Sequence, residues 1–278
     1  MRIGIIGLGH VGSTIAYTLV LQKMVDELVL IDSNQAKVDA ESIELLDTAQ
    51  NIKHNVTILM DYQNLASADF VIFSAGDITI FENADSDRLA ELKVTAKIVE
   101  DVAPKLKKSG FSGKIISITN PCDVIALYLT KLTGFAENQV IATGTVIDTD
   151  RLINITRRQA VMMIGEHGNS QVAVNHVSKA DEMAGRATGW QIYQVKKHTA
   201  FGIASTTLRI LKAMTGNSNE VLNVSCYDPA KGCYYGWPSM FDGKKFIRQN
   251  LELTPEEELS FIKSIETIKQ NYQSIEVL

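Results

Sequence analysis

The sequence predicts an α/β fold, in which a parallel β-sheet covered by helices is followed by a second, mixed α+β unit. Through the first half of the chain, short apolar runs rich in β-branched residues alternate with helical patterns, as strands buried on both faces do. A glycine-rich turn, residues 7–12, lies between the first apolar run and the first helical pattern. From about Thr145 long helical stretches and short strand-like runs replace this alternation. We therefore place a boundary between a domain of residues 1–144 and a domain of residues 145–278.

The first domain is expected to be a complete dinucleotide-binding unit, because its strands and helices alternate throughout. Six apolar runs predict strands over 2–6, 28–32, 56–60, 70–75, 114–119 and 140–143. The helical patterns between them predict helices over 13–22, 35–51, 88–108 and 123–132. An open parallel sheet of this kind is a Rossmann fold, and it binds ligands at the carboxyl ends of its strands.

The second domain is expected to be shorter and mixed, with helices over 148–159, 190–214 and 255–272 and strands over 221–226, 233–237 and 245–253. Only fifteen residues separate Arg151 from His167, fewer than we expect for a helix, a turn and a strand. The stretch from Ser178 to Trp190 also looks compressed. Either this domain is trimmed or residues are missing from the sequence, and we favour the second explanation.

Composition and charge exclude several classes of function. The chain has 278 residues, 45% of them hydrophobic and 21% charged, which is ordinary for a globular protein. A net charge of −5 gives no basic field for nucleic acid or for an anionic membrane. Three widely spaced cysteines, without a C-x-x-C pair, indicate reduced thiols and no metal site. With no signal-peptide pattern and no apolar run of about 20 residues, we expect a cytoplasmic protein.

The glycine-rich turn is expected to bind a dinucleotide. Gly7 permits a tight turn, Gly9 lets a pyrophosphate approach the backbone, and Gly12 lets the helix pack closely on the strand. Asp32 ends the second apolar run and can accept hydrogen bonds from both ribose hydroxyls while repelling a 2′-phosphate, so NAD is favoured over NADP. The alternative is a glycine turn in a non-binding α/β domain, with Asp32 as a helix cap. The residues that we assign to the cofactor here are Gly7, Gly9, His10, Val11, Gly12 and Asp32.

Polar and small residues at the ends of two further strands extend the same crevice. Asn120 follows the fifth strand and can bond to substrate or to nicotinamide, although it can also be a simple turn residue before Pro121. Ala75 ends the fourth strand and Gly76 follows it, and we assign both to the cofactor site.

A histidine between glycines, in Gly165-Glu166-His167-Gly168-Asn169-Ser170, is the candidate acid–base group. Imidazole titrates near neutrality, with a reference pKa of about 6.5, so it can pass a proton in either direction. The alternative is an ordinary surface or core histidine. Asp148 and Arg151 lie three apart and share a helix face, which is compatible with a simple ion pair. The functional interpretation separates them: Asp148 orients and charges His167, while Arg151 holds a carboxylate.

The segment from Gly76 to Arg88 is long for a connection between a strand and a helix. Long connections are often lids, and closure would bring Arg88 onto a reacting carbonyl and exclude water. The alternative is a mobile surface loop with Arg88 solvated near the start of a helix.

Six motifs in order resemble the L-lactate and L-2-hydroxyacid dehydrogenase family, most closely its L-2-hydroxyisocaproate dehydrogenase branch. Besides the glycine motif and Asp32, they are S-x-T-N-P-x-D at 117–123, I-D-T-x-R at 147–151, G-E-H-G-N-S at 165–170 and K-H-T-A-F-G-I-A at 197–204.

The resemblance implies that NADH delivers hydride to C2 of a 2-oxo acid and that the protein is a homo-oligomer, a tetramer or a dimer. It also implies the residue roles. His167 donates a proton with support from Asp148, Arg88 polarises the carbonyl, and Arg151 grips the carboxylate. Asn120 places the reactants, and Thr199 shapes the side-chain pocket. A non-catalytic NAD-binding regulator would not need this set of side chains together.

The lid sequence predicts the class of acid. Residues 77–87 contain no lysine or arginine, so a second substrate carboxylate would be unpaired and malate is an unlikely product. Ile78, Ile80 and Phe81 favour an apolar tail. We expect aliphatic 2-oxo acids such as 2-oxoisocaproate to be preferred, with pyruvate, and hence lactate dehydrogenase activity, as the alternative. The acids of the lid are Asp77, Glu82, Asp85 and Asp87.

Overall fold

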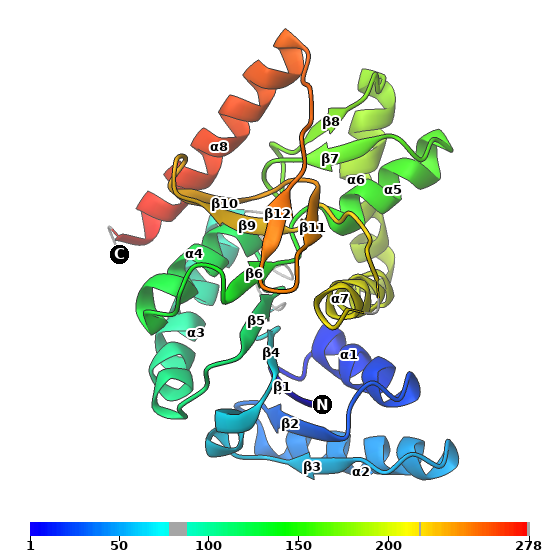
Figure 1. Ribbon diagram of the computed structural model, residues 1–278, viewed down its shortest axis with the longest axis vertical. Coiled ribbons are helices and arrows are strands. Elements are labelled where there is room, and N and C mark those ends of the chain that lie inside the picture. Colours follow the sequence, from blue (N-terminus) through cyan, green and yellow to red (C-terminus); the bar gives the residue numbers. More distant parts are fainter. Residues whose placement is uncertain (78–87, 217, 277–278) are drawn as a thin grey trace.

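The computed structural model of the chain describes residues 1–77, 88–216 and 218–276, except for the side chains of residues 88–90 and 276. Within these residues an eight-stranded sheet runs through the molecule, and helices cover both of its faces (Figure 1). Helices α3, α4 and α8 pack on one face, and α1, α2 and α7 pack on the other. The α/β class and the Rossmann arrangement predicted from the sequence are confirmed.

The described part of the chain folds into strands and helices. The strands are β1 (Arg2–Ile6), β2 (Glu27–Ile31), β3 (Thr57–Leu59), β4 (Phe70–Phe73), β5 (Lys114–Ser117), β6 (Val140–Ala142), β7 (Met162–Ile164), β8 (Val172–Val174), β9 (Ser225–Asp228), β10 (Cys233–Gly236), β11 (Ser239–Phe241) and β12 (Phe246–Arg248). The helices are α1 (His10–Leu21), α2 (Gln35–Asn51), the 3-10 helix η1 (Tyr62–Ser67), α3 (Arg88–Lys108), α4 (Cys122–Thr133), α5 (Val146–Thr156), α6 (Lys179–Lys196), α7 (Phe201–Met214) and α8 (Pro255–Glu276).

The strand order places the candidate site. The sheet runs β10-β9-β6-β5-β4-β1-β2-β3, and β1 to β6 are parallel. From β1 the chain proceeds to β2 and β3 on one side and returns to β4 on the other, so the winding reverses between β1 and β4. The carboxyl edge at such a reversal is where open α/β sheets bind ligands. Beyond β6 the sheet is extended by β9 and β10, which are antiparallel and come from the second half of the chain.

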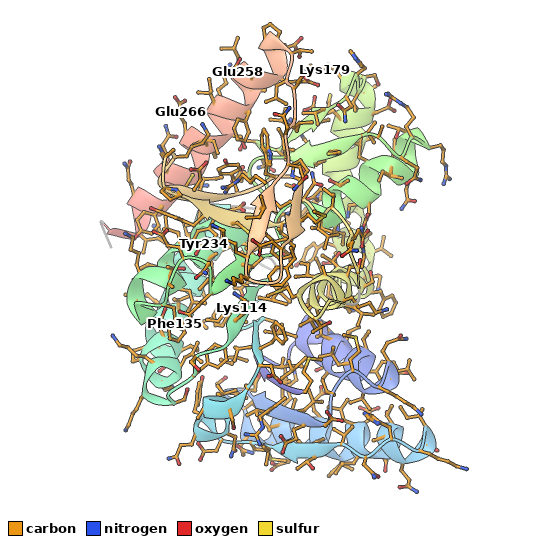
Figure 2. All side chains as sticks on the ribbon, in the orientation of Figure 1. Lys114, Phe135, Lys179, Tyr234, Glu258 and Glu266 are labelled. Atoms are coloured by element: carbon orange, nitrogen blue, oxygen red, sulfur yellow. The ribbon has the colours of Figure 1, made fainter. Side chains whose placement is uncertain are left out.

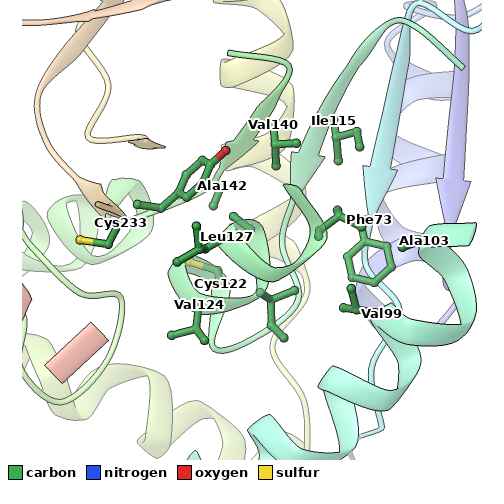
Figure 3. Packing of buried hydrophobic residues seen from close by; sticks show 14 of the residues in the cluster. Phe73, Val99, Ala103, Ile115, Cys122, Val124, Leu127, Val140, Ala142 and Cys233 are labelled. Atoms are coloured by element: carbon green, nitrogen blue, oxygen red, sulfur yellow. The ribbon is translucent and has the colours of Figure 1, made fainter. Parts of the chain in front are cut away.

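Alternate residues of the parallel strands fill two separate cores. Leu28 and Leu30 of β2 face the core under α1, α2 and α7, whereas Val29 and Ile31 face the core under α3, α4 and α8. Both faces of the strand are therefore apolar, which explains its nearly continuous hydrophobic sequence. Figure 3 shows the second of these cores, in which Phe73 of β4 lies beside Val99 and Ala103 of α3.

The second half departs from the sequence prediction at one long helix. Residues 190–214 were expected to form a single helix, but α6 ends at Lys196 and α7 begins at Phe201. Lys197 closes α6 in the left-handed conformation, with φ of 61°, and its N–H bonds to the carbonyl of Tyr193. The break turns the chain between the two helices and brings residues 198 and 199 to the cavity described below.

Helix α6 also begins at Lys179, well before the expected start at 190, so the stretch that looked compressed is helical. The other differences concern strands. The strand expected at 221–226 begins only at Ser225, and the long strand expected at 245–253 is reduced to β12. In the shortened interval, α5 ends at Thr156, β7 begins at Met162, and a tight turn joins them. A helix, a turn and a strand therefore fit between Arg151 and His167, so no missing residues are needed there.

Helix α8 joins the second half to the sheet. Its apolar side packs on α4 and β10, through residues such as Phe261 and Ile265. Figure 2 shows Lys179, at the start of α6, at the same end of the molecule as Glu258 of α8. There the ammonium group of Lys179 lies 3.3 Å from the carboxylate of Glu256. Among the described residues, no helix is long and apolar enough to cross a membrane.

Candidate active site

A cavity of about 580 Å³ opens at the carboxyl edge of the sheet, where the winding reverses. Its lining includes the turn after β1 and the segments after β4 and β5. The loop after β7, helix α6 and the α6–α7 connection also line it. Of the side chains predicted from sequence, the lining includes Gly9, His10, Val11, Gly76, Asn120, Asp148, Arg151, His167 and Thr199.

The glycine-rich turn has the shape that a pyrophosphate requires. A Cβ at Gly12 would lie 1.9 Å from the carbonyl oxygen of Gly7, so a side chain there would push α1 off the strand. Gly7 has φ of +94°, and a Cβ there would meet the backbone of Ala75 at 2.4 Å. At Gly9, by contrast, nothing lies within 4 Å of an added Cβ. Gly9 is also the N-cap of α1 and offers no side chain to the first N–H groups of the helix. These donors and the space beside them fit an anionic phosphate.

Asp32 lies directly after β2 and is tied to the same turn. Its Oδ2 accepts a hydrogen bond from the Leu8 backbone N–H at 2.7 Å, and its Oδ1 accepts one from Asn34 at 3.0 Å. The carboxylate therefore has a fixed position beside the glycine-rich turn, although it is outside the residues that line the cavity. A carboxylate held at the end of the second strand fits the ribose of NAD.

Asn120 ends the segment after β5 and lines the cavity. Its Oδ1 is buried and has no hydrogen-bond partner among the described residues. A buried amide oxygen without a partner is costly, so this atom fits a donor on a bound ligand. The Asn120–Pro121 bond is cis. Gly76 lines the cavity beside it, and Ala75 packs behind, with its carbonyl accepting the Thr119 hydroxyl at 2.8 Å.

His167, Asp148 and Arg151 meet in the cavity. Asp148 Oδ2 lies 2.5 Å from Nδ1 of His167, and Asp148 Oδ1 lies 3.0 Å from Nη1 of Arg151. The sequence interpretation separated an Asp148–Arg151 ion pair from the functional roles of the two residues. Both contacts occur together, because one carboxylate binds the imidazole and the guanidinium at the same time, and the separate roles of the two residues stay a prediction.

The electrostatics of Asp148 fix the tautomer of the histidine. Burial alone would raise the pKa of Asp148, but the charges and hydrogen bonds of His167 and Arg151 hold that pKa below its usual value. The ionised carboxylate only accepts, so Nδ1 of His167 carries the hydrogen of this bond. Nε2 is then the ring nitrogen that can exchange a proton with a substrate.

The loop that carries His167 is held by buried groups. Gly165 has φ of +86°, and a Cβ there would lie 2.4 Å from Oγ of Ser264. A Cβ at Gly168 would lie 2.7 Å from Cδ of Glu166. Both glycines of the motif are thus required by close packing. The backbone N–H of His167 donates to Oδ2 of Asp123 at 2.7 Å. Burial raises the pKa of Asp123 to about 6, although its bond to His167 opposes the shift.

One face of α6 forms a wall that the sequence interpretation missed. Arg186, Gly189, Trp190 and Tyr193 recur at helical spacing and all line the cavity. Gly189 lies against Arg151, where an added Cβ would be 3.1 Å from Nη1. The spacing of 186, 189, 190 and 193 was a signal for a shared face, but it did not tell which surface the face meets. Further lining residues missed from sequence are Lys37, Ser74, Glu91, Thr95, Ile118, Thr119, Asn169, Gln171 and His198.

Two sequence predictions lie outside the described residues. Arg88 begins α3, but its side chain is not described, and residues 78–87 of the expected lid are not described either. Among the described residues, no cluster of three or more histidine, cysteine or acidic side chains could hold a metal ion.

Comparison with known proteins identifies the family. Residues 1–142 match the lactate/malate dehydrogenase family in its NAD binding domain. The chain is 32% identical over 293 residues to an L-lactate dehydrogenase of Fusobacterium nucleatum, covering 92% of this chain and 90% of that protein. The chain belongs to the lactate/malate dehydrogenase family. This family member is therefore an NAD-dependent oxidoreductase that acts on the CH–OH group of 2-hydroxy acids.

Solved structures of family members have the same fold as this dehydrogenase. A minor L-lactate dehydrogenase from Enterococcus mundtii in a ligand-bound form is 28% identical, with a TM-score of 0.87 over 99% of this chain and 98% of that one. A malate dehydrogenase from Archaeoglobus fulgidus in complex with NADH is 26% identical, with a TM-score of 0.87 over 99% of both chains. The expected L-2-hydroxyisocaproate branch is not tested by these names and stays a prediction.

Proposed function

We propose that the protein reduces monocarboxylic 2-oxo acids to L-2-hydroxy acids with NADH, and that pyruvate is its main substrate. The observation that carries this proposal is the contact of one buried carboxylate, Asp148, with both His167 and Arg151 inside the cavity. A proton donor and a carboxylate anchor in one place are what the reduction of a 2-oxo acid requires.

The position of each side chain supports one role in the reduction. NADH supplies the hydride. Protonated His167 gives a proton from Nε2 to the oxygen that becomes the alkoxide, and ionised Asp148 stabilises the imidazolium before this transfer. Arg151 binds the substrate carboxylate while Asp148 holds its Nη1. Asn120 offers its unpartnered Oδ1 to the ligand, and Thr199 borders the substrate side chain. Arg88, the first residue of α3, polarises the carbonyl.

There are two candidates for the main substrate, pyruvate and 2-oxoisocaproate. Pyruvate is supported by the curated relatives, several of which are called L-lactate dehydrogenase and are about 30% identical over nearly the whole chain. The sequence interpretation ranked 2-oxoisocaproate higher. Its basis is the apolar sequence of Ile78, Ile80 and Phe81, which favours an apolar substrate tail. A dicarboxylic acid is disfavoured by the four acids and the absence of basic residues between Asp77 and Asp87.

The test is steady-state oxidation of NADH with pyruvate, 2-oxoisocaproate and oxaloacetate, followed by the absorbance of NADH. We expect the highest kcat/KM with pyruvate and a poor rate with oxaloacetate. A higher kcat/KM with 2-oxoisocaproate would replace pyruvate by the second candidate. Turnover of none of the three acids would refute the proposed function.

The assembly and location are also proposals. Ile43 and Leu46 of α2 and Phe201 of α7 are exposed apolar side chains, and they support the expected homo-oligomer, a tetramer or a dimer. Light scattering of the purified protein should give a mass at least twice 30.6 kDa, and a monomer mass would contradict the proposal. The three free cysteines support a reducing, cytoplasmic location. The division into domains of residues 1–144 and 145–278 likewise remains a proposal.

A further inference from the structure

Two histidines outside the catalytic group stack on each other at the cavity. His10 is the first residue of α1, in the glycine-rich turn, and His198 lies in the α6–α7 connection. Their ring centroids are 3.9 Å apart and their planes differ by 13°. Both rings line the cavity together with Gly9. The stack therefore joins the cofactor-binding turn to the connection that also carries Thr199.

The two stacked histidines lie at the N-terminus of α1, where the phosphates of a dinucleotide are expected to bind. Gly9 caps α1 without a side chain and has open space beside it, so the first N–H groups of the helix are offered to an anion. His10 follows directly. Lys37, from the first turn of α2, lines the same cavity. Two phosphate groups here would meet a helix N-terminus, a lysine and two imidazole rings.

The charges around His10 disfavour its protonated form while no anion is bound. Burial lowers the pKa of His10, and the nearby charges of His198, Lys37 and Lys196 lower it further. Two protonated rings at the observed separation would also repel each other. The carboxylates of this region accept hydrogen bonds from groups other than the two imidazoles. Asp32 accepts from the backbone N–H groups of Leu8 and Asn34, and Glu41 accepts from the hydroxyl of Ser13.

We propose that His10 and His198 bind the cofactor pyrophosphate as a pair, and that the pair takes up a proton when the cofactor binds. The negative charges of the pyrophosphate favour the protonated form that the neighbouring lysines oppose. By linkage, the cofactor then binds more tightly as the pH falls. This inference rests on NAD binding, which the family establishes, and does not depend on which 2-oxo acid is the substrate.

The test is calorimetric binding of ADP-ribose, which contains the pyrophosphate but lacks the nicotinamide ring that would approach His167. Titrations at pH 7 in buffers of different ionisation enthalpy give the number of protons taken up. Titrations between pH 6 and pH 8 give the dependence of Kd on pH. For the wild type we expect uptake approaching one proton and a Kd that weakens by up to about tenfold per pH unit.

Variants of His198 distinguish the uptake of a proton by the ring from its stacking on His10. His198→Phe keeps an aromatic ring over His10 but cannot hold a proton, and His198→Gln covers the case in which the phenylalanine disturbs folding. Both should reduce the proton uptake and flatten the pH dependence of Kd. The matched control is His176→Asn, since His176 is exposed and has φ of 58°, which asparagine tolerates. The control should behave as the wild type.

Two results would overturn the proposal: no proton uptake by the wild type, or the same uptake in the wild type and both His198 variants. The activity with 2-oxo acids is measured separately. A failure of this proposal would therefore leave the proposed function intact, and a failure of the proposed function would leave the ADP-ribose result interpretable.

Discussion

The replacement Asp148→Asn tests the electrostatic role of the buried carboxylate. Asparagine has nearly the same volume, so the cavity keeps its shape while the negative charge is lost. The lost charge lies 2.5 Å from Nδ1 of His167, and Asp148 is only 2% exposed. Taking the charge centres as about 4 Å apart at an effective dielectric constant of about 20, the imidazolium loses about 4 kcal/mol of attraction. Since 1.4 kcal/mol is a factor of ten, kcat/KM should fall on the order of a hundredfold to a thousandfold.

The assay is NADH oxidation with saturating cofactor and varied pyruvate. Asp150→Asn is the matched control, because Asp150 is on the same helix but its carboxylate pairs with Arg209 at 2.6 Å instead of His167. The control should keep kcat/KM within about threefold of the wild type, since a partly exposed ion pair contributes little. If Asp148→Asn kept more than about a third of the wild-type kcat/KM, the charge would not support the proton donor as we argue.

Three further changes test the geometry. Gly12→Ala, whose methyl would lie 1.9 Å from the Gly7 carbonyl oxygen, should lower Tm, whereas Gly9→Ala should keep Tm and weaken NADH binding measured by fluorescence; equal Tm losses would contradict this contrast. Gly189→Ala should reduce kcat/KM for pyruvate and 2-oxoisocaproate alike, by roughly tenfold, because its methyl would crowd Arg151, which binds the carboxylate common to both acids; unchanged kcat/KM would argue against Arg151 as the anchor. The raised pKa of Asp123, about 6 against an ordinary 3.8, means that the folded state binds more protons between these values, so stability falls as the pH rises through this window. Between pH 4 and pH 6, the free energy of unfolding of the wild type should fall by about 1 to 3 kcal/mol relative to that of Asp123→Asn, as measured by urea titration. The same pH dependence in both proteins would refute the raised pKa of Asp123.

Local patterns predicted the first half of the fold well, because its signals are short-range. Helix α2 has the predicted bounds, Gln35–Asn51, and begins where the Asn34 side chain accepts the N–H of Lys37. Strand β2 was recognisable because residues on both of its faces are buried. The glycine spacing at 7–12 reflects the close packing of Gly12 on the Gly7 carbonyl within the turn, although Gly7 itself also packs on the backbone of Ala75 after β4.

The second half was less predictable because tertiary contacts decide it. Nothing in the local sequence marks the left-handed Lys197 that ends α6, so the break between α6 and α7 was missed. The stack of His198 on His10 was missed for the same reason, because only the fold brings these two residues together. The sequence did predict His167, Asp148 and Arg151 as site residues. It could not show that one carboxylate bridges the other two, since that depends on the positions of β7 and α5.

The proposed NADH-dependent reduction depends most on His167 as its proton donor. The direct measurement compares wild type and His167→Gln by NADH binding and by turnover of pyruvate in the same preparation. We predict that NADH binding stays within about twofold while turnover falls by about a hundredfold to ten-thousandfold, the usual contribution of an acid–base group. Turnover by the variant close to that of the wild type, with NADH bound normally, would contradict the account.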